Sequence, residues 1–507
     1  MDTTVQLELG LDPQDWTALR ELGHRIIDDM FSYLESIGER PAWQPIPDPV
    51  KRSFSDPVPL EPQGAQSAYD QFRRNILPYP TGNIHPRFWS WVSGTGSAGG
   101  MLAELLSGAM NSSGHGGDHA AVYVERQVVS WLKQALGYPQ EATGLLVGGG
   151  SMANFVGLAV ARNARAEWNV KRDGLGKGQR PLVVYCSTET HSSVVKAVEL
   201  LGLGSQALHQ IEVDGDFRIR TDRLCRAIAD DRACGKHPIC VVANAGTVNS
   251  GAIDDLTALA NVCGTENLWL HVDGAFGAIP AISPKLRPLL RGMERADSLA
   301  FDLHKWMYLP YDVGCVLIRH PMHHRDTFSY RAPYLNSQNR GLAGGPDWFS
   351  HYGLELSRGF RALKVWFSLK EHGLKTYQSL VEQNVAQAQY LGDLVAGDQR
   401  LELLAPIPLN VVCFRYRGKL RDEATLKELN QEILFRLHES GVAAPSGTVI
   451  GARFAIRVAN VNHRSRRQDF KLLVHEVIRL GDEISAAWET GSQQPYPASD
   501  RGSAHRV

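Results

Sequence analysis

Lys305 is the residue in this sequence whose type and position most clearly suggest chemistry. It follows an apolar run directly, in SLAFDLHKW (298–306). Burying an ammonium group is costly unless the group is paired or chemically transformed. One interpretation is a lysine whose charged end reaches solvent, as is usual. The other is a lysine whose desolvated amine forms a Schiff base with a carbonyl compound.

Asp273 carries the second chemical group that such a lysine would need. Pyridoxal phosphate is the common cofactor bound through a lysine, and it requires an acid beside its ring nitrogen. Asp273 ends the apolar run LWLHVD (268–273), and the small residues Gly274 and Ala275 follow it. At about 4 Å and an effective dielectric constant of about 20, the carboxylate and the ring would attract by roughly 4 kcal/mol. The alternative is an aspartate that caps a helix or forms a turn.

A glycine-rich segment, GGGSMAN (148–154), opens a stretch with helical apolar spacing. The free amide groups and the dipole at a helix N-terminus suit a phosphate, and Gly150 and Ser151 would stand at that point. The alternative is an ordinary turn with a serine cap. The segment has neither the GK[ST] of a Walker A loop nor a GxGxxG pattern.

His191 and Thr247 also stand where strands are expected to end. His191, in STETHSSVVKA, could stack on an aromatic cofactor, although a capping or turn histidine has the same position. Thr247, in NAGTVNSG, is more typical of a turn when taken alone. The order Ser151, His191, Thr247, Asp273, Lys305 places every candidate at a strand end or a helix start. Such a set indicates one shared site.

Short apolar runs separated by helical stretches supply the elements that must position these residues. The runs are LVVYC (182–186), CVVANA (240–245), LWLHVD (268–273), SLAFDL (298–303) and VGCVLI (313–318). Continuous apolar strands that alternate with helices are typical of a largely parallel sheet covered on both faces. Ligands of such sheets bind at the carboxyl ends of the strands. The fold class is therefore α/β, with residues 83–375 as the large domain.

The segments on either side have different patterns. Residues 1–82 contain a helical pattern at 12–37 and then seven prolines, so we expect an arm that lies on another surface, such as a partner subunit. Residues 320–355 are expected to be irregular, and a long helix is expected at 357–373. Residues 376–490, with strands at 411–416 and 454–459, predict a smaller α/β domain, and the polar residues 491–507 predict a disordered tail.

Composition narrows the classes of function. The 507 residues include 53 Lys+Arg and 54 Asp+Glu, for a formal net charge of −1, which argues against nucleic acid or an acidic membrane as partner. No apolar run approaches the length of a transmembrane helix, and the N-terminus lacks a signal-peptide pattern. The seven cysteines are scattered singly, without a metal-binding spacing. We expect a cytoplasmic protein that acts on a small molecule and binds no metal.

The sequence resembles the group II pyridoxal-phosphate-dependent amino acid decarboxylases, which include aromatic-L-amino-acid, histidine and glutamate decarboxylases. The resemblance is carried by HPRFWSW (85–91), GGSMAN (149–154), HSSVVKA (191–197), WLHVDGAFG (269–277), ADSLAFDLHKW (296–306) and SRGFRALKVWF (357–367). It implies the fold-type I, aspartate aminotransferase-like architecture and a homodimer with its active site at the subunit interface. It also implies decarboxylation of an L-amino acid, most typically an aromatic one, to the amine and carbon dioxide.

The resemblance assigns roles to individual residues. Lys305 would carry pyridoxal 5′-phosphate, Asp273 would pair with its ring nitrogen, and His191 would stack on the ring opposite Ala275. The other cofactor contacts implied are Gly150, Ser151, Thr247, Asp302 and His304. The substrate wall would include Trp91, Val92 and His115.

Several positions depart from the family pattern. The family has a tyrosine proton donor on a loop before the segment matched here by LSRGFRALK, and counting back from Arg358 gives Phe349. A phenylalanine cannot donate a proton, and in plant relatives it accompanies oxygen-dependent aldehyde synthesis. Other tyrosines that could take this role are Tyr330, Tyr334 and Tyr352.

Two cofactor-side positions differ as well, since Val248 replaces a threonine and Asp302 replaces an asparagine. Three functions therefore stay open. They are an amino acid decarboxylase, an aldehyde synthase on the same scaffold, and a catalytically silent relative that binds a partner. An intact set of Lys305, Asp273 and His191 argues against the silent relative.

Overall fold

Seven strands form the larger of two sheets, in the order β1-β7-β6-β5-β4-β2-β3. The computed structural model describes residues 10–13, 15–176, 179–330, 338–419 and 422–490. The strands are β1 (Thr143–Val147), β2 (Leu182–Ser187), β3 (Leu208–Ile211), β4 (His237–Asn244), β5 (Trp269–Asp273), β6 (Ser298–Asp302) and β7 (Gly314–Ile318). Only β7 runs antiparallel to its neighbours, β1 and β6, so the predicted mostly parallel sheet is confirmed.

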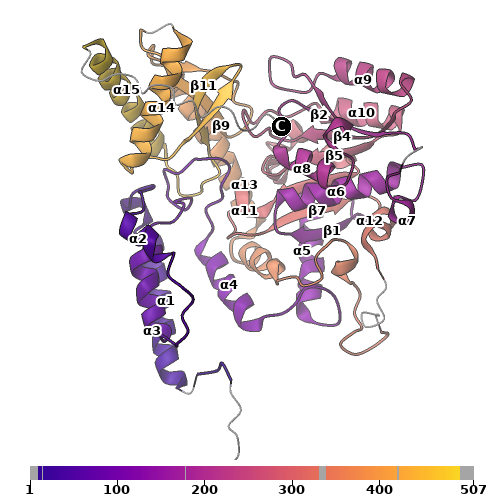
Figure 1. Ribbon diagram of the computed structural model, residues 1–507, viewed down its shortest axis with the longest axis horizontal. Coiled ribbons are helices and arrows are strands. Elements are labelled where there is room, and N and C mark those ends of the chain that lie inside the picture. Colours follow the sequence, from indigo (N-terminus) through magenta and orange to yellow (C-terminus); the bar gives the residue numbers. More distant parts are fainter. Residues whose placement is uncertain (1–9, 14, 177–178, 331–337, 420–421, 491–507) are drawn as a thin grey trace, which may run out of the picture.

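Helices cover both faces of this sheet, which explains its continuous apolar strands (Figure 1). Every residue of β2, β5, β6 and β7 is buried. One face packs on α6 (Gly150–Arg165) and α8 (Ser192–Leu200). The opposite face packs on α5 (Ala120–Leu136), α9 (Thr221–Ala233) and α10 (Leu256–Glu266).

A second sheet, antiparallel and in the order β10-β11-β9-β8, follows in the chain. Its strands are β8 (Leu401–Leu403), β9 (Val411–Tyr416), β10 (Ser446–Ile450) and β11 (Arg453–Ala459). It packs on α14 (Glu423–Glu439) and α15 (Arg467–Glu489) around a core of its own. Strands were predicted at the positions of β9 and β11, whereas β8 and β10 were not foreseen.

The long helix α13 (Arg361–Ala396) joins the two sheet regions (Figure 1). It contains the expected domain boundary between residues 375 and 376 and has a break at Gly373, whose φ of 71° is not helical. The predicted helix at 357–373 is confirmed from Arg361 onward, whereas residues 357–360 are not helical. The boundary itself stays a prediction.

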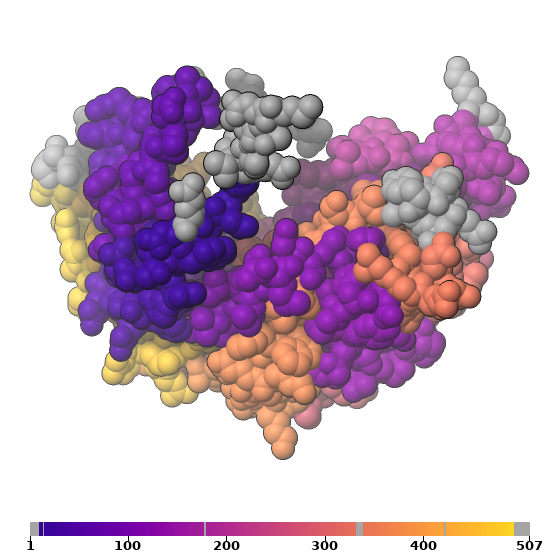
Figure 2. Space-filling model, turned by 90° about the horizontal axis from the view of Figure 1, so that it is seen from below, coloured from indigo at the N-terminus to yellow at the C-terminus, as the bar shows by residue number. Residues whose placement is uncertain are grey.

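The N-terminal helices lie along the side of the molecule, beside the C-terminal sheet region (Figures 1 and 2). They are α1 (Trp16–Glu35), α2 (Asp48–Ser53) and α3 (Ala65–Gln71). On α1, Trp16, Leu19 and Phe31 remain 57%, 40% and 40% exposed. The structure thus leaves an apolar surface on the arm without a partner among the described residues of this chain.

The remaining helices are α4 (Ala98–Met110), α7 (Val170–Asp173), α11 (Leu303–Trp306) and α12 (Pro321–Phe328). The expectation of irregular structure throughout 320–355 is wrong at α12, where Pro321 occupies a first-turn position that does not need a backbone donor. The predicted disordered tail, 491–507, lies outside the described residues. No helix in the described part of the chain is both long and apolar enough to span a membrane.

A buried ion pair between Arg358 and Glu125 ties the segment before α13 to α5. The Arg358 Nη2 to Glu125 Oε1 distance is 2.6 Å, and the two side chains are 1% and 3% exposed. Arg358 also donates to the carbonyl oxygens of Gly114 and Leu146. Several separate chain segments therefore meet at one guanidinium group.

Replacing Arg358 with methionine should lower the free energy of unfolding by about 3–5 kcal/mol, because it leaves the Glu125 carboxylate buried without a cation. Urea denaturation followed by circular dichroism measures this loss. The double variant Arg358→Met/Glu125→Leu should lose less than the two single variants combined. A loss below about 1 kcal/mol in the single variant, as for an exposed pair, would contradict this role.

Candidate active site

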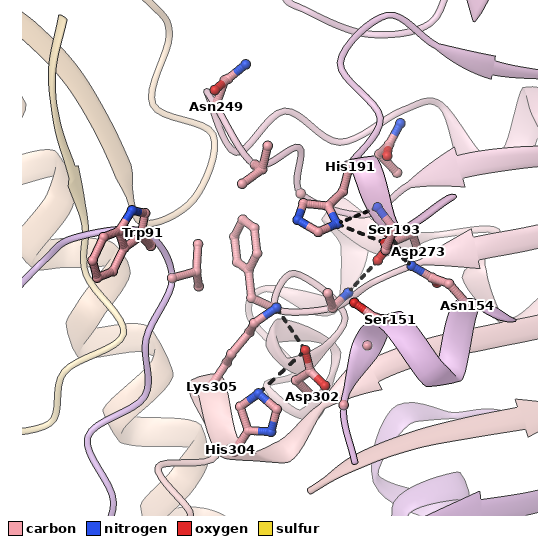
Figure 3. Close-up of a pocket in the computed structure, with 18 of the residues that line it drawn as sticks. Trp91, Ser151, Asn154, His191, Ser193, Asn249, Asp273, Asp302, His304 and Lys305 are labelled. Carbon is pink, nitrogen blue, oxygen red and sulfur yellow. Dashed lines mark hydrogen bonds and ion pairs between the residues drawn. The ribbon is translucent and has the colours of Figure 1, made fainter. Parts of the chain in front are cut away.

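A cavity of about 800 Å³ lies at the carboxyl ends of β4, β5 and β6, with β10 and β11 on its far side (Figure 3). Ten of the residues singled out in the sequence line it: Trp91, Val92, Gly150, Ser151, His191, Asp273, Ala275, Asp302, His304 and Lys305. Thr247, His115 and Phe349 are not among its lining residues. Residues separated by more than two hundred positions thus meet in one site, at the sheet edge where ligands were expected.

Lys305 points into the cavity from α11, a helix of four residues that begins where β6 ends (Figure 3). Its Nζ lies 2.8 Å from Oδ2 of Asp302, and the two side chains are 22% and 2% exposed. Burial opposes the charged amine, but the charge and hydrogen bond of Asp302 outweigh burial and raise the pKa of Lys305. The amine is accordingly held in an ion pair at the wall of the cavity.

Asp273 ends β5 and is fixed by two donors. Its Oδ2 accepts from Asn154 Nδ2 at 2.8 Å, and its Oδ1 accepts from the Ala275 backbone N–H at 3.0 Å. With a relative exposure of 4%, the side chain is buried at the cavity wall. A carboxylate held in this way is suited to pair with a protonated ring nitrogen.

A buried hydrogen-bond relay continues from Asp273 into the core, and the sequence analysis did not foresee it. Asn154 Oδ1 lies 2.9 Å from His271 Nε2, and His271 Nδ1 lies 2.7 Å from Ser298 Oγ. Burial lowers the pKa of His271 to about 4, so the ring is neutral at pH 7. Because the amide oxygen can only accept, Nε2 carries the proton and Nδ1 accepts from Ser298. The relay therefore fixes the orientation of the Asn154 amide that holds Asp273.

His191 caps α8 and faces the cavity from the side of Asp273 (Figure 3). Its Nδ1 accepts from the Ser193 backbone N–H at 3.1 Å, which leaves the other ring nitrogen to carry the proton. Burial lowers the pKa of His191, although the charge of Asp273 opposes this effect. The ring is therefore neutral at pH 7 and can stack on a flat ligand.

The glycine turn before α6 has no room for side chains. A Cβ atom on Gly150 would lie 2.9 Å from Asp302 Oδ2, and one on Gly149 would lie 3.3 Å from a ring carbon of His304. Gly149 also has a φ of 152°. The first N–H groups of a helix have no acceptors within it, and α6 begins at this turn. The backbone N–H groups of this turn, Ser151 and His304 together border a space that fits a phosphate group.

Two residues that the resemblance implies for the site, His115 and Thr247, do not line the cavity, whereas Trp91 and Val92 do. Trp91 is 62% exposed at the cavity, beside the buried Val92. His115 instead lies 2.9 Å from the Ser113 hydroxyl, with its ring centroid 5.8 Å from that of Trp348. Thr247 is buried in a turn, where its hydroxyl contacts that of Ser250 at 3.0 Å. In this chain, therefore, neither His115 nor Thr247 is brought to the cavity.

Phe349 lies in the core that joins α6 and α8 to the sheet, and 4% of it is exposed. The Arg358 guanidinium is 5.3 Å from its ring centroid. Of the tyrosines considered for the same role, Tyr352 packs against His324 at 5.0 Å between ring centroids, and Tyr330 is 78% exposed. Tyr334 lies outside the described residues. The position of Phe349 therefore lends no geometric support to a role in catalysis.

Arg457, on β11, is a cavity residue that the sequence analysis missed. It is 3% exposed and donates to the backbone carbonyl oxygens of Trp91, Val248 and Asn249. These contacts join the second sheet to the segment before α4 and to the turn that follows β4. An arginine inside the apolar pattern FAIRVA was the available signal, since a buried guanidinium requires partners.

Comparison with known proteins decides the family. The chain matches the pyridoxal-dependent decarboxylase conserved domain over residues 47–417. The chain belongs to the pyridoxal-dependent decarboxylase family. This match confirms the resemblance found in the sequence and, with the fold, a PLP-dependent carboxy-lyase.

Individual relatives of this decarboxylase cover nearly its whole length. It is 33% identical to the aromatic-L-amino-acid decarboxylase of Bacillus atrophaeus over 478 residues, which is 93% of this chain and 97% of the relative. The solved structure of Oryza sativa TDC with PLP and tryptamine has a TM-score of 0.87 at 27% identity, covering 94% and 100% of the two chains. Rhodiola rosea 4-hydroxyphenylacetaldehyde synthase has a TM-score of 0.83 at 25% identity, covering 93% and 100%. The fold-type I architecture and the cofactor are thereby confirmed.

The raised pKa of Lys305 predicts how fast the apoenzyme of this decarboxylase reacts with pyridoxal phosphate at different pH values. Only the uncharged amine attacks a carbonyl carbon, and its fraction grows about tenfold per pH unit below the pKa. The rate of covalent binding should therefore rise with pH, and Asp302→Asn should raise it at neutral pH by lowering the pKa of Lys305. Stopped-flow absorbance measures both effects. Equal rates at pH values two units apart would contradict the ion pair.

Proposed function

We propose that this decarboxylase converts an aromatic L-amino acid to the corresponding amine and carbon dioxide. The main structural support is a single cavity that holds Lys305, Asp273 and His191 and is bordered by Trp91 and Phe276. The aromatic rings offer apolar contact area to an aromatic side chain. The Bacillus atrophaeus relative, an aromatic-L-amino-acid decarboxylase, supports the same substrate class.

Each residue contributes a distinct physical effect. Pyridoxal phosphate, when bound, supplies an electron sink for the bond that breaks. Lys305 would hold the cofactor covalently, and Asp273 would keep a positive charge on the ring nitrogen. His191 would cover one face of the ring and Ala275 the other, while the turn at Gly150 and Ser151 would bind the phosphate. Binding and orientation by these side chains are the contribution of the protein.

We also propose a homodimer in the cytoplasm. The exposed apolar residues of α1, which include Trp16 and Phe31, support burial of the arm on a second copy of the chain. All seven cysteines are free, as is usual in a reducing compartment. A second subunit would also bring its own segments toward the open side of the cavity.

Oxygen-dependent aldehyde synthesis is the second candidate, because an aldehyde synthase is among the similar structures. In that reaction the amino acid, oxygen and water yield the aldehyde, carbon dioxide, ammonia and hydrogen peroxide. The sequence argument for it depended on Phe349, whose buried place in the core does not favour it. The support that remains for this alternative is the similarity of the fold to that of an aldehyde synthase.

A product assay tests the proposal. The holoenzyme is incubated in air with a panel of L-amino acids, and carbon dioxide, amine, aldehyde, ammonia and peroxide are measured. We expect amine and carbon dioxide in equal amounts, without oxygen uptake, and fastest turnover with tryptophan, tyrosine or dihydroxyphenylalanine. Aldehyde with equal ammonia would establish the second candidate. No product across the panel would instead favour a silent binding protein.

The variant Phe349→Tyr tests the loop residue separately. Because the Phe349 ring lies in the core beneath Arg358, we expect the ratio of amine to aldehyde to stay unchanged. The ratio is measured under the same conditions as for the unaltered enzyme. If the unaltered enzyme forms aldehyde, a shift toward amine in the variant would return Phe349 to the catalytic role that the sequence suggested.

A further inference from the structure

A second cavity, of about 430 Å³, lies where the end of α5, the 3-10 helix Ile279–Ile282 and α13 meet. α13 borders it on both sides of the break at Gly373, with Leu369 before the break and Leu374 after it. None of the described residues that line it also lines the cavity of Lys305. Its volume is within the range of roughly 300–1,000 Å³ that is typical of small-molecule sites.

The inner wall of this second cavity is apolar. Every lining residue that is buried has an apolar side chain, and these residues are Leu132, Leu136, Ile279, Ile282 and Met307. An apolar ligand gains free energy when it leaves water for such a wall. Met307 stands two positions after Lys305 in the chain, so the wall adjoins the segment that carries the cofactor lysine.

The charged side chains at this cavity are both positive. Arg287 and Lys370 line it, and no acidic residue is among its described lining residues. Arg287 donates from Nε to the Ala281 carbonyl oxygen at 2.7 Å and from Nη2 to the Ala135 carbonyl oxygen at 2.8 Å. These neutral acceptors hold the guanidinium in place but do not neutralise its charge. No acidic side chain in the described part of the chain forms an ion pair with Arg287.

Lys370 is held at the cavity by aromatic rings. Its Nζ lies 5.7 Å from the ring centroid of Trp131 and 5.8 Å from that of Trp366. Such contacts attract an ammonium group without supplying a counter-ion, and Lys370 likewise has no ion pair with a described acidic residue. Two cations without counter-ions beside an apolar wall favour a ligand with one negative group and an apolar body. They disfavour an amine, because its ammonium group would be repelled.

We propose that this cavity binds a small apolar carboxylate that has no amino group. The apolar body would lie against Leu132, Ile282 and Met307, and the carboxylate would pair with Arg287 and Lys370. Binding forms and breaks no covalent bond. The site is separate from the cavity of Lys305, so the inference does not depend on which amino acid this decarboxylase converts.

2-Naphthoate is a suitable probe, because it is a rigid aromatic carboxylate without an amino group. Titration calorimetry of the holoenzyme counts the bound molecules. We expect about one more molecule per chain in the unaltered enzyme than in Ala135→Phe, whose added ring would take up space in the cavity. 2-Naphthamide has nearly the same size and no charge, and it should bind about tenfold more weakly than naphthoate.

Charge variants test the two cations. Arg287→Gln should weaken the binding of naphthoate about tenfold while leaving that of naphthamide nearly unchanged, which separates a lost charge from a distorted cavity. Lys370→Gln should weaken naphthoate binding in the same direction. Lys375→Gln is the matched control, since Lys375 is an exposed lysine of α13 that does not line the cavity. This control should keep the affinity of the unaltered enzyme for naphthoate.

Several results would overturn the proposal. One is an equal number of bound naphthoate molecules in the unaltered enzyme and in folded Ala135→Phe, since the probe would then bind elsewhere. Another is equal affinity for naphthoate and naphthamide, or an affinity for naphthoate that Arg287→Gln does not change. A third is a shift of the monomer–dimer equilibrium by Ala135→Phe in sedimentation experiments, which would show that a second copy of the chain covers the cavity. All three leave amine formation, and so the proposed function, untouched.

Discussion

Lys305→Ala should abolish the absorbance of the bound cofactor at roughly 420 nm and lower turnover by about a thousandfold. The amine at the end of this side chain is the group that would join the cofactor covalently. In the structure it points into the cavity and is held 2.8 Å from Asp302 Oδ2, and no other lysine is among the lining residues of the described cavity. Absorbance spectra and steady-state rates at saturating cofactor measure the two effects.

Lys364→Met is a matched control for this variant. Lys364 is also buried and ion-paired, with Glu104 as its partner, but it lies on α13 and does not line the cavity. The control should keep the absorbance band and most of the activity. Normal turnover and an unchanged band in Lys305→Ala would remove Lys305 from its role and with it the proposed function.

Asp273→Asn should lower kcat by about a thousandfold, since loss of roughly 4 kcal/mol of attraction to a protonated ring corresponds to three powers of ten. The change keeps the size of the side chain but removes its charge. Without that charge the ring nitrogen loses its proton, and the bound cofactor becomes a weaker electron sink. The rate at saturating cofactor separates this effect from weaker cofactor binding.

Asp231→Asn is the corresponding control. Asp231 is another buried aspartate, with Tyr185, His209 and Lys236 as partners, and it lies outside the cavity. Its replacement should affect stability without a comparable fall in kcat. A fall of less than about tenfold in Asp273→Asn would show that the ring nitrogen does not depend on this carboxylate.

The residues that could be predicted from the sequence share one property. Lys305, Asp273 and His191 each stand at the end of an apolar strand or the start of a helix. The carboxyl ends of parallel strands meet at one edge of a sheet, so their positions in the chain were enough to bring them together. The mostly parallel sheet was predictable for the same reason, from runs that are apolar on both faces.

Other features of the structure could not be predicted from the spacing of residues along the chain. Counting back from Arg358 placed Phe349 at a catalytic position, but an irregular segment has no fixed rise per residue, and the ring lies in the core instead. The relay through Asn154, His271 and Ser298 was missed because hydrogen-bond partners distant in sequence meet only after the sheet has formed. The antiparallel direction of β7 likewise follows from pairing, not from its apolar residues.

Arg457 has a consequence for how substrates are selected. Its guanidinium, on β11, holds the carbonyl oxygens of Val248 and Asn249 from the opposite wall, so the two walls cannot draw apart without depriving a buried cation of two of its acceptors. We therefore expect the width of the cleft to be set before any amino acid binds. On this basis, we expect discrimination among amino acids to depend on the shapes of the two walls.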